Sequence, residues 1–326
     1  MLNNKNILLI LPKFFGYDHI IVSRLNQAGA NVFKVYEDMD EVNYFFRFIN
    51  AYFPRYMPMV MDKYFLKKFL PIANNLDYVF LIRGEFLNPE VIERLREKTP
   101  QKCTYCMYQW DSVKNNKNAL NLQRYFDKVS TFDPVDAEEY GWNYRPLFFI
   151  PELIESDEPE LDVLYMCSLH SKRIEILNKL KKICKEKKLV LYKRVYSKKI
   201  IYYKRKYLDK REGYVNADND DVSAKKIDVN DTYKFYNKTK VIVDYTHPGQ
   251  KGFTMRTIEA LGCKKKLVTN NKLIKNADFY DENNIFVYDG EELEIPDDFI
   301  HKKCNELDKN IYEKYSVDTW LSSILL

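Results

Sequence analysis

The sequence lacks the features that most directly assign a chain to a common class. It contains no run of about 18 uncharged apolar residues, so we expect no membrane-spanning helix. Glycine is scarce, with 9 among 326 residues, and the motifs G-x-G-x-x-G, GxxxxGK[ST], HExxH and GxSxG are absent. The missing glycine fingerprint disfavours a dinucleotide-dependent dehydrogenase, and no internal repeat indicates a solenoid.

Potential metal ligands are also few. The 4 histidines are isolated, and Cys103 and Cys106 form the only close pair among 6 cysteines. This pair falls in a strand-like run, where positions i and i+3 point to opposite faces, and a zinc site would need a second pair or suitably spaced histidines. We therefore expect packed, reduced thiols and no metal site. The start of the chain lacks the pattern of a signal peptide, so we expect a cytoplasmic protein.

The charge is mild overall but concentrated in one stretch. The net charge is +5, yet between Lys179 and Arg211 lysines and arginines far outnumber the acids, which are Glu186 and Asp209. Interleaved tyrosines make this stretch suitable for an anionic membrane surface or single-stranded nucleic acid, and a solvated basic face is the simpler interpretation. Residues 44–70 are rich in aromatics and broken by prolines, which indicates short helices that pack in the core or face lipid.

Strands and helices alternate through the first half of the chain. We predict strands at 7–11, 32–36, 78–82, 104–108 and 128–132, and helices at 18–28, 89–98, 117–125 and 136–140. A strand, a helix and a further strand in succession are typical of a parallel sheet.

The alternation restarts after residues 146–159, where three prolines and an acidic run indicate a domain boundary. The predicted strands are 162–167, 189–192, 241–245, 267–269 and 285–287, and the predicted helices are 172–188, 231–238, 253–261, 298–315 and 317–325. We therefore predict an α/β protein with Rossmann-like domains at 1–150 and 151–300. C-terminal helices at 301–326 are expected to pack back across the cleft between them.

The segment 241–269 carries most of the chemical information. A buried strand enters a loop in which Gly252 lets the backbone approach a ligand closely, and Thr254 is placed to cap the helix that follows. Loops after the strands of a parallel sheet gather at one edge, where ligands bind. A helix start at that edge suits a diphosphate, to which Arg256 would add a planar fork of donors. Glu259, one turn later, would accept hydrogen bonds from a ribose diol.

The same spacing also fits an ordinary strand–helix–strand unit with a surface arginine and glutamate, and spacing alone leaves both interpretations open. The run from Gly252 to Gly262, followed by a basic step and Leu267–Thr269, resembles the donor-site segment of GT-B glycosyltransferases. More narrowly, it resembles the bacterial lipopolysaccharide and capsule biosynthesis branch often labelled CgeB-like. Further elements similar to that branch are Tyr108–Ser112, Tyr125–Lys128, Thr131–Asp133 and Ser168–Arg173.

This resemblance implies a GT-B fold, in which two Rossmann-like domains have parallel sheets that face a central cleft. The glutamate of the run typically contacts the nucleotide ribose in that family, a role that falls to Glu259 here. The other residues implied in binding the nucleotide sugar are Tyr245 and Lys251, which precede the run, and Gly252, Thr254 and Arg256 within it. Many retaining members have a further glutamate at the position of Lys251, so the resemblance leaves the stereochemical outcome open.

The turn after the first strand of the second half has a physical case of its own. Ser168, Lys172 and Arg173 bring a hydroxyl and two cations to the start of a helix, where GT-B enzymes place groups that contact the diphosphate. The alternative is a basic, solvated first turn. His170 lies in the same turn, and an isolated histidine is more often structural or at the surface.

Glycosyl transfer needs a general base for the acceptor hydroxyl, and the resemblance implies that this base lies on a loop of the first domain. The catalytic candidates at strand ends are Asp111, Glu85 and Asp133. Asp111 is the first choice because the element Trp110–Ser112 directly follows a strand. The structural alternatives are a helix cap or a partner of the tryptophan for Asp111, and an ion pair with Arg83 for Glu85.

The predicted activity is metal-independent transfer of a sugar from a nucleotide-diphosphate sugar, with no cofactor, to a saccharide or lipid-linked acceptor in cell-surface polysaccharide biosynthesis. Helix dipoles and the cations Arg173, Lys251 and Arg256 would stabilise the leaving diphosphate. The acidic run 218–221 is expected to be solvated. A GT-B-fold nucleotide-sugar epimerase is an alternative, and a nucleic-acid-binding protein is disfavoured because the basic residues are confined to one stretch. Peripheral contact with the inner face of an anionic membrane stays open.

Overall fold

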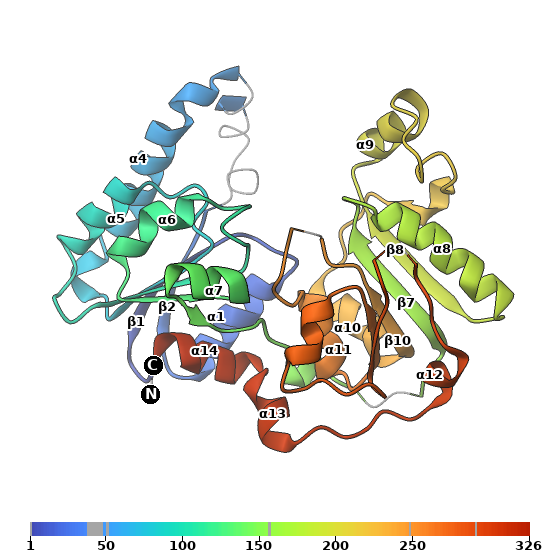
Figure 1. The fold of residues 1–326 in the computed structure, drawn as a ribbon. Helices are drawn as coiled ribbons and strands as arrows, with labels where there is room; N and C mark the ends of the chain where they lie inside the picture. The colour runs from blue at the N-terminus through green and yellow to red at the C-terminus, as the bar shows by residue number, and fades with distance from the viewer. Residues whose placement is uncertain (1, 38–47, 50–51, 156–157, 248, 291) are drawn as a thin grey trace. The chain divides into compact units, whose positions relative to one another are not determined.

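The computed structural model describes residues 2–37, 48–49, 52–155, 158–247, 249–290 and 292–326 (Figure 1). The chain forms two compact units, which are Met1–Pro146 with Val317–Leu326, and Leu147–Ser316. The first boundary predicted from the sequence lies at 150/151, four residues beyond the one between the units. Within the described ranges, no helix is both long enough and apolar enough to cross a membrane. Within the stretch from residue 44 that was predicted to form short helices, residues 44–47 and 50–51 lie outside the described residues.

The first unit is built on a six-stranded sheet in the order β2-β1-β3-β4-β5-β6. Its strands are β1 (Asn6–Leu11), β2 (Asn31–Tyr36), β3 (Tyr78–Ile82), β4 (Thr104–Gln109), β5 (Lys128–Thr131) and β6 (Asn143–Tyr144). All pairings are parallel, and the register sets Ile7 beside Val32 on one side and beside Tyr78 on the other. The central strands are buried apolar runs because helices cover a parallel sheet on both faces.

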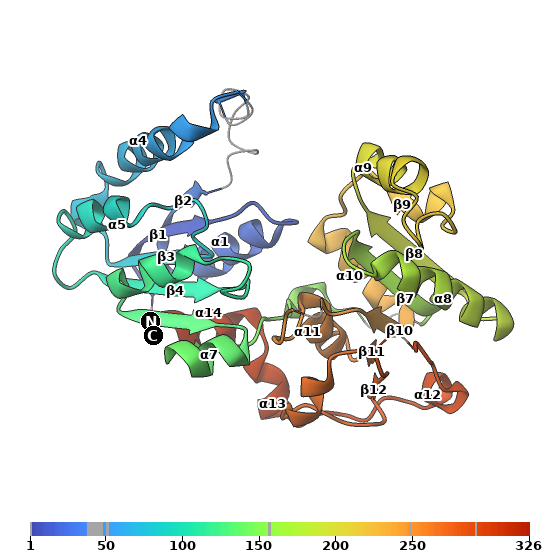
Figure 2. The ribbon, with the colours of Figure 1, turned by 45° about the horizontal axis from the view of Figure 1, so that its top comes forward.

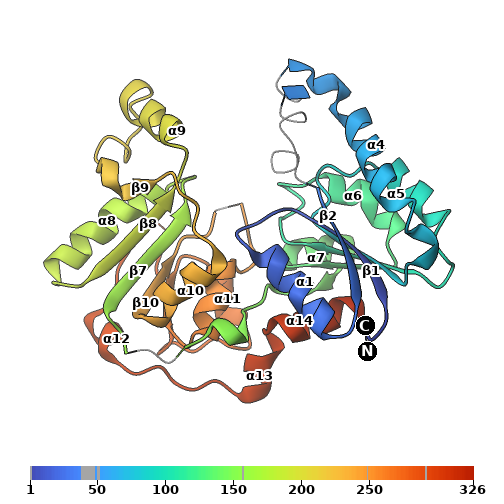
Figure 3. The ribbon, with the colours of Figure 1, turned by 180° about the vertical axis from the view of Figure 1, so that it is seen from behind.

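The helices of the first unit are α1 (Tyr17–Gln27), α4 (Met57–Phe69), α5 (Pro89–Arg96), α6 (Asn118–Leu122), α7 (Pro134–Tyr140) and α14 (Val317–Leu325). The last of these comes from the far end of the chain and contacts α1 and β4 (Figure 3). Its Trp320 is fully buried and meets the ring of Tyr108 edge-on at 4.8 Å. The C-terminal helix therefore completes the core of the first unit.

The second unit repeats the architecture with a sheet in the order β12-β11-β10-β7-β8-β9 (Figure 2). Its strands are β7 (Leu161–Ser168), β8 (Leu191–Tyr196), β9 (Val222–Ser223), β10 (Thr239–Asp244), β11 (Lys266–Thr269) and β12 (Ile285–Val287), and all pairings are parallel. This is the strand order of the common dinucleotide-binding sheet, whose direction of growth reverses between its first and fourth strands. That switch point lies between β7 and β10. The predicted α/β class with two parallel Rossmann-like sheets is confirmed.

The helices of the second unit are α8 (Arg173–Glu186), α9 (Lys199–Tyr203), α10 (Val229–Asn237), α11 (Met255–Gly262), α12 (Asp297–His301) and α13 (Lys309–Lys314). The predicted helix 298–315 is therefore two helices, separated by residues 302–308. The helices after residue 300 are divided between the units, since α13 belongs to the second and α14 to the first. That residues 301–326 pack across a cleft stays a prediction.

Helix α11 ends at Gly262, one residue beyond the predicted end, and Lys264 takes the left-handed conformation after it, with a φ of 53°. The glycine is needed because a Cβ there would lie 2.4 Å from the ring of Phe149. One local prediction is wrong for an identifiable reason. The acidic run 218–221 is not wholly solvated, because Asp221 is buried and accepts hydrogen bonds from the amines of Lys181 and Lys193.

Candidate functional site

The first group of candidate residues lies at the switch point of the second sheet. Arg173 begins α8 just after β7 and is almost fully buried. Its guanidinium donates to the carbonyl oxygen of Ser168, at the end of β7, and twice to that of Tyr245, just after β10, at 3.1 to 3.3 Å. Three of its donors are directed at the backbone, which gives Arg173 a positioning role; that it also contacts a diphosphate stays a prediction. Lys172, immediately before it, is exposed.

Asp244, the last residue of β10, connects the polar residues at this edge of the sheet. It is fully buried, and its carboxylate accepts hydrogen bonds from the hydroxyls of Thr246 (3.2 Å) and Thr254 (2.9 Å) and pairs with Arg256. Thr254 also accepts a hydrogen bond from the backbone N–H of Thr257 at 3.2 Å and so caps α11, as predicted. One buried carboxylate therefore fixes both the helix start and the arginine of its first turn.

Arg256 is held by Asp244 but is not enclosed by it. Its side chain is 14% exposed, whereas that of Asp244 is 0% exposed. Burial lowers the pKa of the guanidinium, but Asp244 and the weaker contributions of neighbouring acidic groups together outweigh burial, so the pKa is raised. The Nε of Arg256 is buried and has no hydrogen-bond partner among the described residues, which is the kind of donor that a bound anion or a water satisfies.

The loop between β10 and α11 is anchored by two asparagines that follow β11. The side chain of Asn270 accepts from the N–H of Thr246 and donates to its carbonyl oxygen, at 2.8 and 3.2 Å. The amide of Asn271 donates to the carbonyl oxygens of Lys251 and Gly252, at 3.3 and 3.4 Å. Gly252 is buried and Lys251 is exposed. The loop therefore packs its glycine inside the unit and presents the charge of Lys251 to solvent.

His170 lies beside this loop, with its ring centroid 6.0 Å from that of His247. Partial burial and the nearby charges of Arg173 and Arg256 lower the pKa of His170 from 6.5 to about 4. The imidazole is therefore neutral near pH 7 and can donate or accept a hydrogen bond without adding charge. His170 is exposed, in agreement with the interpretation of a surface histidine, and its electrostatic setting had no signal in the sequence.

Glu259 lies deeper than the other predicted donor-site residues. It is 2% exposed, and one carboxylate oxygen accepts a hydrogen bond from the hydroxyl of Tyr236 on α10 at 3.1 Å. Tyr236 is itself buried, and burial together with the charge of Glu259 raises the pKa of its hydroxyl far above the ordinary value. This neutral hydroxyl fixes the orientation of the Glu259 carboxylate. Contact between Glu259 and a ribose stays a prediction.

The first unit presents its own group of polar residues after β3 and β4. Arg83 and Gly84 both have φ of 76°, a conformation unusual for the arginine. The Arg83 carbonyl oxygen accepts from the side-chain amides of Gln109 (2.7 Å) and Asn116 (2.8 Å), which hold this backbone in place. The guanidinium pairs with buried Glu37 at 2.6 Å. Strained backbone held by side chains is often found at functional sites.

The three predicted catalytic carboxylates have different settings. Asp111 is half-buried and makes no hydrogen bond to any described residue, and burial followed by the charge of Glu85 raises its pKa, against the opposing charge of Arg83. Glu85 is exposed and lies 3.5 Å from Arg83, the ion pair considered as its structural alternative. Asp133 is buried, and its carboxylate accepts from the N–H of Val135 at 3.0 Å, so it caps α7. These settings favour Asp111 as a base and Asp133 as a structural residue.

Metal-ligating residues do not gather anywhere in the described ranges in groups of three or more. Cys103 and Cys106 are both buried, and burial raises the pKa of each thiol to about 12. A thiol with such a pKa stays protonated and packs as an apolar group.

Sequence reasoning missed Asp244, the asparagine pair and Tyr236. Asp244 had a signal, since it is an acid at the carboxyl end of a buried strand within the segment already singled out. Tyr236 had none, because its contact with Glu259 depends on how α10 packs against α11.

In sequence, the chain matches no family model and no curated protein. In structure, it is similar to the sucrose-phosphate synthase of Thermosynechococcus elongatus, with a TM-score of 0.55, 14% identity, and 88% of this chain and 86% of that chain covered. It is also similar to an α-glucosyltransferase solved with UDP and a mismatched DNA, with a TM-score of 0.52, 11% identity, and coverage of 86% and 81%. A third similar structure is HepE of Anabaena with UDP and glucose, with a TM-score of 0.52, 11% identity, and coverage of 97% and 92%.

These similarities extend over both units rather than one. The two six-stranded parallel sheets therefore have the GT-B fold, as predicted from the resemblance. At such low identity the likeness concerns fold alone, and it carries no support for the narrower lipopolysaccharide and capsule branch.

Proposed function

We propose that the chain is a glycosyltransferase that transfers a sugar from a nucleotide-diphosphate sugar to a saccharide or lipid-linked acceptor. The observation that carries this proposal is the arrangement around Asp244, where Arg256, the start of α11 and the loop residues Thr246, Lys251 and Gly252 meet at the switch point of the second sheet. Ligands of open parallel sheets bind at such points. In two structures of similar fold, the bound ligand is UDP.

The roles at the donor site follow from the settings of the side chains. Arg256, Lys251 and Lys172 supply positive charge for the diphosphate, and the start of α11 adds its free N–H groups. Arg173 holds the ends of β7 and β10 together through Ser168 and Tyr245. Gly252 and Thr254 shape the loop and the helix start, and Glu259 accepts the ribose hydroxyls. The diphosphate is stabilised by these groups without a metal in this proposal.

Asp111 is the proposed general base. Its raised pKa and uncommitted carboxylate suit a group that must take a proton from an acceptor hydroxyl. Glu85 is the second candidate, and its proximity raises the pKa of Asp111 further. Because Lys251 occupies the position at which retaining relatives have a glutamate, the proposal includes a base but assigns no stereochemical outcome.

The proposed acceptor is a saccharide used in cell-surface polysaccharide biosynthesis. The elements Tyr108–Ser112 and Ser168–Arg173 that resemble lipopolysaccharide and capsule enzymes support a polysaccharide acceptor, and the acceptor would be lipid-linked if the enzyme works at a membrane. One segment of the second unit has suitable chemistry. Ile200 is 78% exposed and Leu208 77% exposed, and the exposed cations around them are Lys198, Lys199, Lys204, Lys210 and Arg211.

Apolar side chains among cations bind anionic bilayers, with each cation near the surface contributing ~1 kcal/mol. We include in the proposal that residues 198–211 contact the cytoplasmic face of an anionic membrane. Vesicles of phosphatidylglycerol should co-sediment with the protein, and those of phosphatidylcholine should not. Replacing both Ile200 and Leu208 by serine should abolish co-sedimentation. Equal binding of this variant would contradict the contact.

A thermal-shift panel of UDP, GDP, CMP and their sugars tests the donor site. A ligand at 100 times its Kd stabilises the folded state by ~2.7 kcal/mol, which raises the Tm of a protein of this size by several degrees. At least one nucleotide should produce this shift, and Glu259→Ala should reduce it while Lys182→Gln, on the exposed face of α8, should not. If no nucleotide shifts the Tm, or if Glu259→Ala responds like the wild type, the proposal is wrong. Product analysis with and without an acceptor separates transfer from epimerisation.

A further inference from the structure

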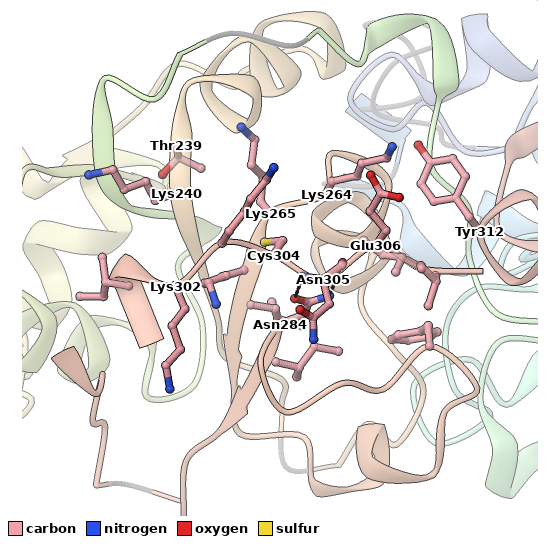
Figure 4. A pocket seen from close by; sticks show the side chains of 18 of the residues that line it. Thr239, Lys240, Lys264, Lys265, Asn284, Lys302, Cys304, Asn305, Glu306 and Tyr312 are labelled. Atoms are coloured by element: carbon pink, nitrogen blue, oxygen red, sulfur yellow. Dashed lines mark hydrogen bonds between the residues drawn. The ribbon is translucent and has the colours of Figure 1, made fainter. Parts of the chain in front are cut away.

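The second unit contains a cavity of about 570 Å³ that belongs to none of the groups described above (Figure 4). It lies at the amino ends of three strands, since Thr239, Lys266 and Ile285 are the first residues of β10, β11 and β12. The candidate donor site lies at the carboxyl ends of the same sheet. A six-residue strand such as β10 separates these two edges by roughly 17 Å. The volume is in the range of sites for small organic ligands.

The lining has two chemically distinct parts. Leu261, Phe279, Ile285 and Leu307 contribute apolar surface. Lysine supplies seven of the lining residues, and Glu306 is the one acid among them. A cavity that combines these two parts suits a ligand with an apolar body and one or more negative charges.

Only some of these lysines are balanced by carboxylates. Lys240 pairs with Asp162 at 2.7 Å, Lys309 with Glu313 at 3.6 Å and Lys302 with Asp298 at 4.0 Å. In the described part of the chain, Lys264 and Lys303 have no carboxylate within ion-pair distance, and the amine of Lys264 lies 5.6 Å from the ring centre of Tyr312. The cavity therefore carries positive charge that its own residues do not neutralise.

Buried Lys266 adds to this excess. It is 2% exposed, donates a hydrogen bond to the carbonyl oxygen of Asn283, and lies 4.5 Å from the ring centre of Phe299. Burial lowers the pKa of Lys266 because removing the ammonium group from water is unfavourable. An anion in the cavity would offset that cost.

The wall that carries Lys303 is fixed rather than loose. Residues 302–308 have no helix or strand of their own, but Asn284 accepts from the N–H of Asn305 at 2.8 Å and donates to its carbonyl oxygen at 2.9 Å. The amide of Asn283 donates to the carbonyl oxygen of Lys303 at 2.7 Å. These bonds attach the wall to the residues just before β12, so the cavity is built into the fold of the unit.

We propose that this cavity binds a small organic phosphate at a second site, separate from the donor site. The phosphate accepts charge-assisted hydrogen bonds from lining amines that have no carboxylate partner, those of Lys264 and Lys303. The apolar or aromatic body of the ligand covers Leu261, Phe279 and Leu307. Inorganic phosphate lacks the body and an uncharged aromatic lacks the charge, so each binds less well than a molecule that has both.

Phenyl phosphate is the probe for this site, titrated calorimetrically into the full chain. We expect binding at one site, at least tenfold tighter than that of inorganic phosphate or phenol. The double variant Lys264→Gln/Lys303→Gln should weaken it at least tenfold, and Leu307→Glu should do the same by placing a carboxylate in the cavity. The matched control Lys182→Gln/Lys275→Gln, with the same charge change on exposed surfaces, should bind like the wild type.

The donor-site variant Arg256→Lys should also bind phenyl phosphate like the wild type, which makes this test independent of the proposed glycosyl transfer. The inference is overturned if phenyl phosphate does not bind, if the Lys264/Lys303 variant binds it normally while folded by circular dichroism, or if Arg256→Lys abolishes binding. It is likewise overturned if the Lys264/Lys303 variant retains phenyl phosphate but loses binding to phosphatidylglycerol vesicles, because these lysines would then recognise a lipid surface.

Discussion

Arg256 and Asp244 form an ion pair in which the acid is fully buried and the arginine still reaches solvent. The two residues come from different elements, the first turn of α11 and the end of β10. Because Asp244 also accepts hydrogen bonds from Thr246 and Thr254, the position of the guanidinium is set by the same carboxylate that orders the loop and the helix start. The arginine is therefore oriented before any ligand binds, which reduces the entropy lost on binding.

Arg256→Lys should weaken UDP binding about tenfold, which corresponds to ~1.4 kcal/mol. Lysine keeps the charge but loses the planar fork that can bond to Asp244 and to a phosphate together. Calorimetric titration of UDP measures the change, and Lys182→Gln serves as the control. A variant with unchanged affinity would remove Arg256 from the donor site.

The protonation of His170 should respond to ligand. Its pKa is about 4 in the free protein, because of partial burial and then the charges of Arg173, His247 and Arg256. A diphosphate bound beside it would offset those positive charges and favour the imidazolium, so the pKa should rise when UDP is added. NMR titration of the histidine resonances, assigned with His170→Gln, measures both values. A pKa that stays the same with saturating UDP would place the diphosphate elsewhere.

The lowered pKa of His170 in the folded protein also affects the free energy of unfolding. The imidazole has a pKa near 6.5 when unfolded and about 4 when folded, so between these values the unfolded chain binds more protons. Stability linked to His170 is therefore present above pH 6.5 and is lost as the pH falls toward 4. The ratio of unfolding midpoints in urea at pH 7 and pH 5 should be closer to one in His170→Gln than in the wild type. An identical pH dependence in both proteins would contradict the shifted pKa.

Gly262→Ala should destabilise the second unit. In an ordinary helical position alanine is favoured over glycine by about 1 kcal/mol, but here the new Cβ would lie 2.4 Å from the ring of buried Phe149. Overpacking of this kind costs ~1–3 kcal/mol, so the clash outweighs the helix propensity. Urea denaturation measures the loss, and the double variant with Phe149→Leu should recover part of it. Unchanged stability of Gly262→Ala would show that Phe149 moves freely.

Much of the fold could be predicted from the sequence because parallel strands are local, apolar runs. The predicted strand 78–82 agrees with β3 at both ends, and Thr254 was identified as a helix cap from its residue type and place. The division of the C-terminal helices was harder to predict. Trp320 packs on Tyr108, far away in sequence, and no local pattern indicates which sheet a terminal helix covers.

The candidate site was predictable only in part. The sequence pattern identified the segment with Arg256, whereas the contact between Arg173 and Tyr245 joins residues 72 positions apart. Such a contact depends on the strand order, which places β7 beside β10. Sequence alone therefore indicated candidate site residues but could not distinguish those placed to face a ligand from those that hold the backbone.

Asp111 and Asp133 offer the sharpest test of that distinction, because both follow strands of the first sheet and only one has a structural bond. Asp111→Asn removes the base while keeping the size of the side chain, so kcat should fall ~10²–10⁴-fold with donor affinity unchanged. Asp133→Asn keeps an acceptor for the N–H of Val135, and asparagine caps helices as well as aspartate does, so its kcat should match the wild type.

The measurement is initial-rate kinetics with the nucleotide sugar identified by the thermal-shift panel, together with calorimetric affinity for the donor. Asp133→Ala completes the set, since it removes the cap and should lower the free energy of unfolding by ~1 kcal/mol without changing kcat. If Asp111→Asn keeps its activity, the base must be sought at Glu85, which is close enough to raise the pKa of Asp111. If Asp133→Asn loses activity at normal stability, the carboxylate of Asp133 has a chemical role that its buried cap does not explain.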